Sequence, residues 1–124
     1  MKDDELIVKI AEVKKYIDEN IKEVIDCTAI VDKFNLNLRI FRDQFFLITG
    51  LTPMQYINRV RLNTLVKILK NEEVDNHQKL IAYANEIGLN SAASFCEFVK
   101  RQTKMTSMEF IIHIKSKNES SIHV

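Results

Sequence analysis

One seven-residue motif occurs twice in the chain, and this repetition limits the possible folds more than any other feature. The first copy, LTPMQYI, occupies residues 51–57, and the second, MTSMEFI, begins 54 residues later at residue 105. Each copy places a threonine three residues before a glutamine or glutamate, which is the spacing of a helix capping box. Thr52 and Thr106 are therefore the predicted N-caps of two helices. The repeat predicts two similar helical units.

The composition favours an all-α fold. The 124 residues include only two glycines and one proline, too few for the frequent turns of an all-β protein. No run approaches the roughly 18 apolar residues of a membrane span, and the charged start MKDDELIVKIAEVKK is unlike a signal peptide. The chain is therefore expected to be cytoplasmic, with no membrane partner.

Apolar residues recur at helical spacing and predict about seven helices. In the first half of the chain, the expected inward positions of three successive helices are Leu6, Ile10, Val13 and Ile17; Ile30, Val31 and Phe34; and Leu38, Phe41, Phe45 and Ile48. In the next three helices they are Tyr56, Val60, Leu65 and Leu69; Leu80, Tyr83, Ala84 and Ile87; and Phe95, Phe98 and Val99. Ile21, Val24 and Ile25 are expected to pack the connection between the first two helices. Asn35, Gly50 and Gly88 are predicted helix stops. Asn37 and either Asn90 or Ser91 are predicted N-caps.

The predicted organisation is two helix-turn-helix units joined by a long linker helix, in a homeodomain-like arrangement. The first unit covers residues 1–51, the linker helix 52–71 and the second unit 72–113, and residues 114–124 are expected to form a disordered polar tail. Positive charge gathers in the middle of the chain. Residues 27–71 hold seven basic and two acidic side chains, a net charge of 7 − 2 = +5.

Catalytic and metal sites are not predicted. Cys27 and Cys96 are far apart in sequence, and His77, His113 and His123 lack metal-ligand spacing. No glycine-rich phosphate loop and no paired nucleophile and base occur. An enzyme is therefore not expected, and neither is a cofactor.

Two stretches carry a resemblance to a known family. The segments FRDQFFLITGLTPMQYINRVRL and YANEIGLNSAASFCEFVKRQTKMTSMEF resemble the two helix-turn-helix signatures of the AraC/XylS family of bacterial transcription regulators. The resemblance extends from about Leu6 to Ile111. It implies two recognition helices that enter adjacent segments of the DNA major groove.

The chain departs from the family pattern at several positions. Lys104 stands where the family has a glycine, and Ser107 stands where it has a proline. Asp43, Phe46 and Glu97 stand where basic residues are customary. The first unit is expected to carry most of the specificity, because it offers Arg39 and Arg42 within the positive segment. The second unit offers side chains with few hydrogen-bond donors, which are Ala92, Ala93, Ser94 and Glu97.

Ten side chains are the candidate DNA contacts. They are Arg39, Arg42, Asp43 and Phe46 in the first unit, and Ala92, Ala93, Ser94, Glu97, Lys100 and Arg101 in the second. Arginine grips guanine O6 and N7, aspartate accepts from cytosine, and alanine methyls touch a thymine methyl. Lys100 and Arg101 suit phosphates, although a basic helix end that complements the dipole has the same composition. For Phe46, a base contact and packing on the linker helix are both open.

Double-stranded DNA is the expected partner, and the resemblance adds RNA polymerase for an activator. A separate sensing or dimerisation domain, usual in the family, is not expected within 124 residues. The alternative is a helix-turn-helix module repurposed for protein contacts, which the near-neutral net charge of +1 would suit.

Overall fold

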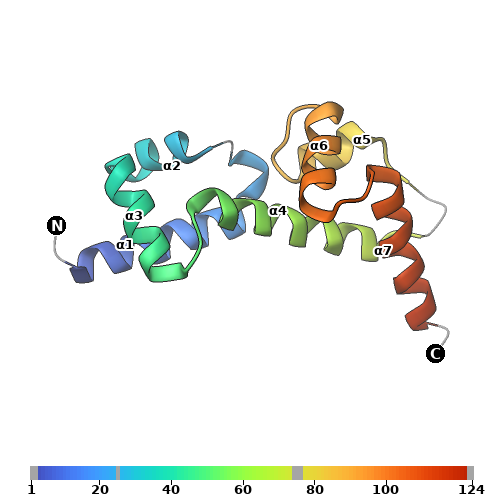
Figure 1. The fold of residues 1–124 in the computed structure, drawn as a ribbon, viewed down its shortest axis with the longest axis horizontal. Helices are drawn as coiled ribbons and strands as arrows, with labels where there is room; N and C mark the ends of the chain where they lie inside the picture. Colours follow the sequence, from blue (N-terminus) through green and yellow to red (C-terminus); the bar gives the residue numbers. More distant parts are fainter. Residues whose placement is uncertain (1–2, 25, 74–76, 123–124) are drawn as a thin grey trace. The chain divides into compact units, whose positions relative to one another are not determined.

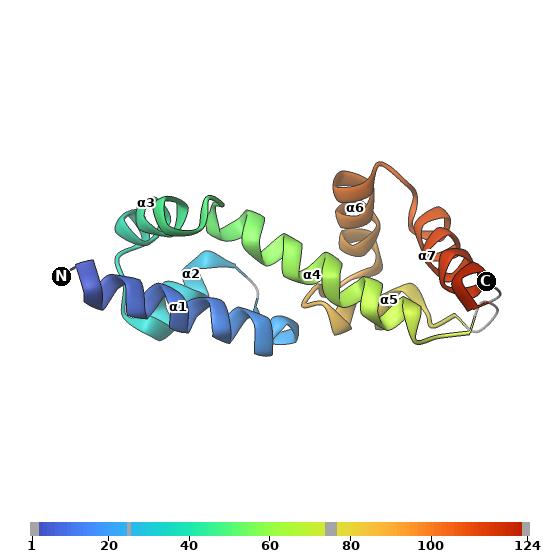
Figure 2. The ribbon, with the colours of Figure 1, turned by 90° about the horizontal axis from the view of Figure 1, so that it is seen from below.

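The chain is entirely helical over the residues that the structure describes. The computed structural model describes residues 3–24, 26–73 and 77–122 (Figures 1 and 2). The elements are α1 (Asp3–Glu19), a 3-10 turn η1 (Ile21–Glu23), α2 (Cys27–Phe34), α3 (Leu38–Thr49), α4 (Pro53–Lys70), α5 (Leu80–Glu86), α6 (Ala92–Thr103) and α7 (Ser107–Ile122). The predicted all-α class is confirmed.

The chain divides into two compact units, Met1–Val60 and Arg61–Val124. The division falls inside α4, the helix that the sequence analysis treated as a separate linker. Ile57, in the first half of α4, belongs to the core of the first unit. Leu65 and Leu69, in the second half, belong to the core of the second. α4 is thus a structural part of both units.

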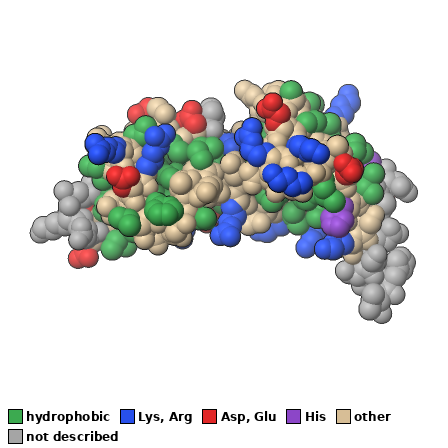
Figure 3. Space-filling view, viewed as in Figure 1, with side chains coloured by type: hydrophobic (Ala, Val, Ile, Leu, Met, Phe, Trp, Pro, Cys, Tyr) green, Lys and Arg blue, Asp and Glu red, His purple; other side chains and the backbone are tan. Residues whose placement is uncertain are grey.

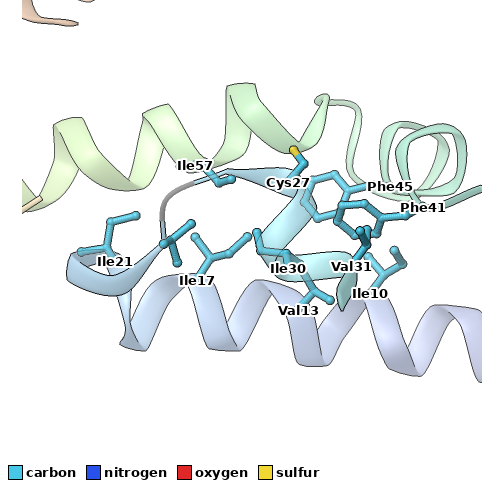
Figure 4. Packing of buried hydrophobic residues seen from close by; sticks show 11 residues of the cluster. Ile10, Val13, Ile17, Ile21, Cys27, Ile30, Val31, Phe41, Phe45 and Ile57 are labelled. Carbon is cyan, nitrogen blue, oxygen red and sulfur yellow. The ribbon is translucent and has the colours of Figure 1, made fainter. Parts of the chain in front are cut away.

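The core of the first unit joins α1, α2, α3 and the start of α4 (Figure 4). Figure 4 shows Val13 of α1 below Ile30 of α2 and Ile17 beside it, with Phe41 and Phe45 of α3 on the other side of Ile30. The two phenylalanine rings lie 5.5 Å apart, centroid to centroid. The predicted stripes of α1 and α2 are confirmed, because their residues are buried or packed against this core.

One predicted core position in this unit is wrong. Ile48 is 42% exposed, because it lies at the end of α3 beside a shallow groove that Ile7, Ile10 and Lys14 of α1 also line. Another predicted packing residue, Ile25, lies outside the described residues.

Two asparagines shape the turn between α2 and α3. Asn35 adopts the left-handed conformation, with φ of 54°, and ends α2. Asn37 then caps α3, since its Oδ1 accepts a hydrogen bond from the Ile40 N–H at 3.1 Å. Gly50 ends α3 with φ of 79°. All three roles agree with the sequence prediction, and α2 and α3 form a helix-turn-helix.

Both copies of the repeated motif form complete capping boxes. The Thr52 hydroxyl accepts from the Gln55 N–H at 3.2 Å, and Gln55 Oε1 accepts from the Thr52 N–H at 2.9 Å. At the second copy, the Thr106 hydroxyl accepts from the Glu109 N–H at 3.2 Å, and Glu109 Oε1 accepts from the Thr106 N–H at 3.0 Å. The repeat therefore starts α4 and α7 in the same way, as predicted.

The second unit packs α5, α6 and α7 against the second half of α4. Its buried core consists of Leu65, Leu69, Tyr83, Ala84, Ile87, Phe95, Phe98, Val99, Phe110 and Ile111. Gly88, with φ of 86°, supplies the turn between α5 and α6. Ser91 rather than Asn90 caps α6, since its hydroxyl accepts from the Ser94 N–H at 3.0 Å. α5 and α6 form the second helix-turn-helix.

A buried ionic network links α7 to the segment between α4 and α5 in this unit. Lys115 of α7 is 1% exposed, and its Nζ lies 2.9 Å from Glu72 Oε1 and 2.9 Å from His77 Nδ1. The Tyr83 hydroxyl and Gln78 Nε2 also donate to the Glu72 carboxylate, at 2.5 and 2.6 Å. These bonds lower the pKa of Glu72 against the opposing effect of desolvation.

α7 runs past residue 114, where the sequence analysis places the start of a polar tail. α7 continues through Ile122. Ile114 packs against the core of the second unit, and the next residue is the buried Lys115. These two contacts extend the helix past the boundary that the polar sequence suggested.

Candidate nucleic-acid interface

α3 is the second helix of the first helix-turn-helix, and its solvent-exposed face carries both charged and apolar side chains. Phe41 and Phe45 are fully buried, so the helix is fixed in one rotation about its axis. Arg39, Arg42 and Asp43 are exposed on the opposite side. Because an α-helix turns about 100° per residue, these three side chains lie on one face. The structure therefore brings the predicted arginines together on one accessible face of α3.

Phe46 belongs to this same exposed face. Phe46 is 52% exposed, so about half of its surface is open to solvent. The hollow beside it has a volume of about 540 Å³ and is lined by Arg42, Asp43, Gln44, Phe46, Leu47 and Thr52. The charged face of α3 thus has an apolar centre.

Sequence reasoning missed two further exposed apolar residues on α3. Leu47 is 71% exposed and Ile40 is 53% exposed. The run FFLI at residues 45–48 contained the signal, because four consecutive apolar residues cannot all face the core of one amphipathic helix. Only Phe45 of this run is buried.

α6 is the second helix of the other helix-turn-helix, and its first turn offers few hydrogen-bond donors. Ala93 and Glu97 are exposed, whereas Ala92 is partly buried. Ser94 is also partly buried, and its hydroxyl accepts from the Ser91 hydroxyl at 2.8 Å. Ser94 is therefore engaged in the N-cap of its own helix.

Basic side chains gather towards the end of α6. Lys100 and Arg101 are exposed, and Figure 3 shows Lys and Arg side chains gathered over α6 on the face in view. Lys100 Nζ donates to the Lys104 carbonyl oxygen at 3.3 Å, a bond that closes the end of the helix. This contact supports the helix-end role of Lys100, and the side chain remains accessible.

The capped helix starts leave few backbone amides available to an anion. The capping boxes engage the N–H groups of Thr52 and Gln55, and Pro53 has none. The Met54 N–H remains outside the first box, and the N–H groups of Ser107 and Met108 remain outside the second. Glu109 is ionised readily, because hydrogen bonds from the Thr106 backbone and hydroxyl lower its pKa.

Arg61 is a basic residue of this region that cannot contact DNA. It is 4% exposed, and its Nε donates to the Ile87 carbonyl oxygen at 3.2 Å. Burial lowers the pKa of this guanidinium. The positive segment 27–71 therefore has one fewer accessible basic side chain.

Neither a metal-binding cluster nor a membrane-spanning helix occurs among the described residues. No group of three or more His, Cys, Asp or Glu side chains within those residues is placed to hold a metal ion. Over the same stretches, no helix is both long and apolar enough to cross a bilayer.

Sequence comparison places transcription activators among the relatives of the chain. No protein-family model matches. The HTH-type transcriptional activator RhaS of Salmonella schwarzengrund is 29% identical over 94 residues, which is 76% of this chain and 32% of that protein. RhaS of Escherichia coli O9:H4 is 33% identical over 58 residues, 47% of this chain and 21% of the relative. The chain thus spans a third or less of the length of these relatives.

Comparison with solved structures establishes the fold. The DNA-binding domain of AdpA, in complex with a target DNA, matches with a TM-score of 0.72 at 19% identity, over 87% of this chain and 94% of that one. An AraC-type regulator from Chromobacterium violaceum matches with a TM-score of 0.66 at 17% identity, over 89% and 91%. This chain has the AraC-type fold. The family resemblance predicted from the sequence is confirmed at this level.

The departures from the AraC-type sequence pattern have different structural outcomes. Lys104 adopts the left-handed conformation, with φ of 66°, at the position where the family has glycine. Ser107 occupies the first turn of α7 as Pro53 does in α4, and its buried hydroxyl has no hydrogen-bond partner among the residues that the structure describes. The AraC-type fold therefore forms without these two family residues, with a non-glycine residue in the left-handed conformation at position 104.

Proposed function

We propose that this chain is a sequence-specific DNA-binding module that regulates transcription. The observation that carries the proposal is the exposed pair Arg39 and Arg42 on the recognition helix of a helix-turn-helix. In this motif the second helix lies in the major groove, and arginine forms the commonest specific contact there, to guanine. α6 is the corresponding helix of the second unit and enters the groove in the same manner.

The two units contribute differently in this proposal. α3 supplies base contacts through Arg39, Arg42 and Asp43, while α6 supplies apolar contacts through Ala92 and Ala93. Lys100 and Arg101 bind phosphates, which position a protein on the duplex without reading its sequence. The first unit therefore carries most of the specificity.

The comparisons support this function. AdpA binds a target DNA through a domain of the same fold, and the RhaS relatives are named transcriptional activators. A regulator of this kind acts in the cytoplasm, where bacterial DNA lies. RNA polymerase is the proposed second partner if the chain works in an activator.

The salt dependence of duplex binding tests the proposal. Because basic residues displace condensed cations from the phosphates, log K should fall linearly with log salt, with a slope of about −0.9 per phosphate contact. The measurement uses fluorescence anisotropy of a mixed-sequence duplex between low and physiological salt. Absent binding at low salt, or a flat response, would instead favour the module that contacts proteins through Phe46, Asp43 and Glu97.

A further inference from the structure

Phe46 is placed at the centre of the charged face of α3. With about 100° of rotation per residue, its direction falls between those of Arg42 and Asp43 and close to that of Arg39. The buried residues Phe41 and Phe45 point to the other side of the helix. A helix face that approaches DNA thus carries a half-exposed aromatic ring in its middle.

The chemistry of the duplex limits what this ring can contact. Phosphates and most base-edge atoms are polar, and a phenyl ring forms no hydrogen bond with them. The major groove offers one apolar group, the C5 methyl of thymine. We infer that Phe46 is a specificity-determining residue that contacts a thymine methyl. This inference rests on the proposed DNA-binding function.

The spacing of Arg42 and Phe46 adds a positional requirement. Four residues of α-helix advance about 6 Å along the axis, and stacked base pairs are about 3.4 Å apart. Both side chains line the same hollow on the exposed face of α3. If Arg42 grips a guanine, the thymine that Phe46 contacts lies within about two base pairs of it.

Leu47 provides a matched control on the same helix. It is apolar and 71% exposed, but the next residue along an α-helix points about 100° away. Leu47 therefore lies at the border of the face, beyond Asp43. Its truncation removes exposed apolar surface from α3 without removing the central ring.

Deoxyuridine substitution tests the inference, because deoxyuridine differs from thymidine only by the missing methyl. A preferred duplex is first selected from a random pool with the wild-type protein. Each thymine of that duplex is then replaced singly, and affinities are measured for the wild type, Phe46→Ala and Leu47→Ala, all verified as folded by thermal unfolding. Burial of one methyl corresponds to an affinity change of about fourfold.

The expected result is one substitution, near a guanine, that weakens the wild type and Leu47→Ala by about fourfold and leaves Phe46→Ala unchanged. Equal losses in the wild type and Phe46→Ala would assign the methyl contact to another residue, such as Ala93, and overturn the inference. Salt-dependent binding that ignores every deoxyuridine would also overturn it, while the proposed function stands. Failure to select any duplex, together with flat salt dependence, would remove the proposed function itself.

Discussion

Arg61 Nε donates a hydrogen bond to the carbonyl oxygen of Ile87, 26 residues away, at 3.2 Å. The bond joins α4 to the residue that ends α5, inside the second unit. The guanidinium is buried, and the loss of one partner would leave a buried carbonyl unsatisfied. The residue therefore stabilises the turn that precedes α6.

Arg61→Met should lower the free energy of unfolding by about 1–3 kcal/mol, the range for a buried polar group deprived of its partner. Urea unfolding followed by circular dichroism measures the effect. Arg59→Met is the matched control, because Arg59 is exposed on the same helix and surface substitutions usually fall within about 0.5 kcal/mol. Equal effects of the two variants would contradict the role assigned to Arg61.

The capping boxes of α4 and α7 predict equal sensitivity at two distant threonines. Thr52→Ala and Thr106→Ala should each cost about 0.5–2 kcal/mol of stability, because each leaves one first-turn N–H without its side-chain acceptor. Thr→Ser at the same positions keeps the hydroxyl and should cost much less. Differential scanning calorimetry compares the four variants. An unchanged melting temperature in both alanine variants would show that the caps do not contribute.

Lys104 and Gly50 predict stability changes of opposite sign. Both residues adopt positive φ at the end of a recognition helix, a conformation that costs a residue with a Cβ about 1–2 kcal/mol. Lys104→Gly should raise stability by up to about 1 kcal/mol, after the larger unfolded-state entropy of glycine is subtracted. Gly50→Ala should lower stability by about 1 kcal/mol. A Cβ at Gly50 meets nothing within 4 Å, so the cost would be conformational rather than steric.

Both Lys104→Gly and Gly50→Ala can be measured by urea unfolding at one pH. A destabilised Lys104→Gly variant would mean that the lysine side chain contributes more than its backbone conformation costs. The hydrogen bond from Lys100 to the Lys104 carbonyl should survive in the glycine variant, because it involves only the backbone of residue 104.

The Glu72 network predicts a stability loss in acid. The folded pKa of Glu72 is below its ordinary value of 4.5, so the unfolded state takes up the proton first as the pH falls. The stabilisation is complete above about pH 5 and decreases through the acid range as the carboxylate is protonated. Glu72→Gln should flatten this acid limb, and it should cost up to about 3–5 kcal/mol at pH 7, because Lys115 remains buried without its carboxylate.

Lys115→Met separates the two halves of this ion pair. Methionine fills the buried volume, and Glu72 keeps its bonds from Tyr83 and Gln78. We expect Lys115→Met to be milder than Glu72→Gln when both are unfolded by urea at pH 4 and pH 7. An acid limb in Glu72→Gln as steep as that of the wild type would show that another group titrates.

The unequal roles proposed for α3 and α6 predict distinct effects on DNA binding. Arg42→Ala should weaken binding to the preferred site by about 1–3 kcal/mol and relax preference at one or two base pairs. Lys100→Ala should weaken all sequences alike and reduce the salt slope by about one. Glu97→Ala should change little or tighten binding, because it removes a negative charge from the groove.

One duplex set compared across Arg42→Ala, Lys100→Ala and Glu97→Ala decides between the units. Loss of sequence preference in Glu97→Ala, with preference intact in Arg42→Ala, would assign specificity to the second unit instead of the first.

Helix ends were predictable from the sequence because their causes are local. Asn35, Asn37, Thr52 and Thr106 each act on backbone groups within five residues. In the sequence, by contrast, Lys115 lies in a stretch that has the composition of a polar tail. Its partners Glu72 and His77 are 43 and 38 residues away, and no spacing rule relates positions that only the fold brings together.

The candidate site shows the same distinction. The outward direction of Arg42 and Phe46 followed from the helical register once Phe41 and Phe45 were assigned to the core. The exposure of Ile48 did not follow from that register, because it depends on how far α1 extends beside α3. The conformation of Lys104 was not predictable either, since its sequence position indicated only a missing glycine.

The sharing of α4 by both units has a consequence for how the chain folds. Formation of the first turn is the unfavourable step of helix growth, and later turns are added more easily. α4 requires this nucleation once, and its first turn already holds a capping box and a proline. We expect the unit that folds first to supply the first turns of α4, from which the helix then extends into the other unit. If the chain were cut after Val60, the second half of α4 would have to form its first turn without that help.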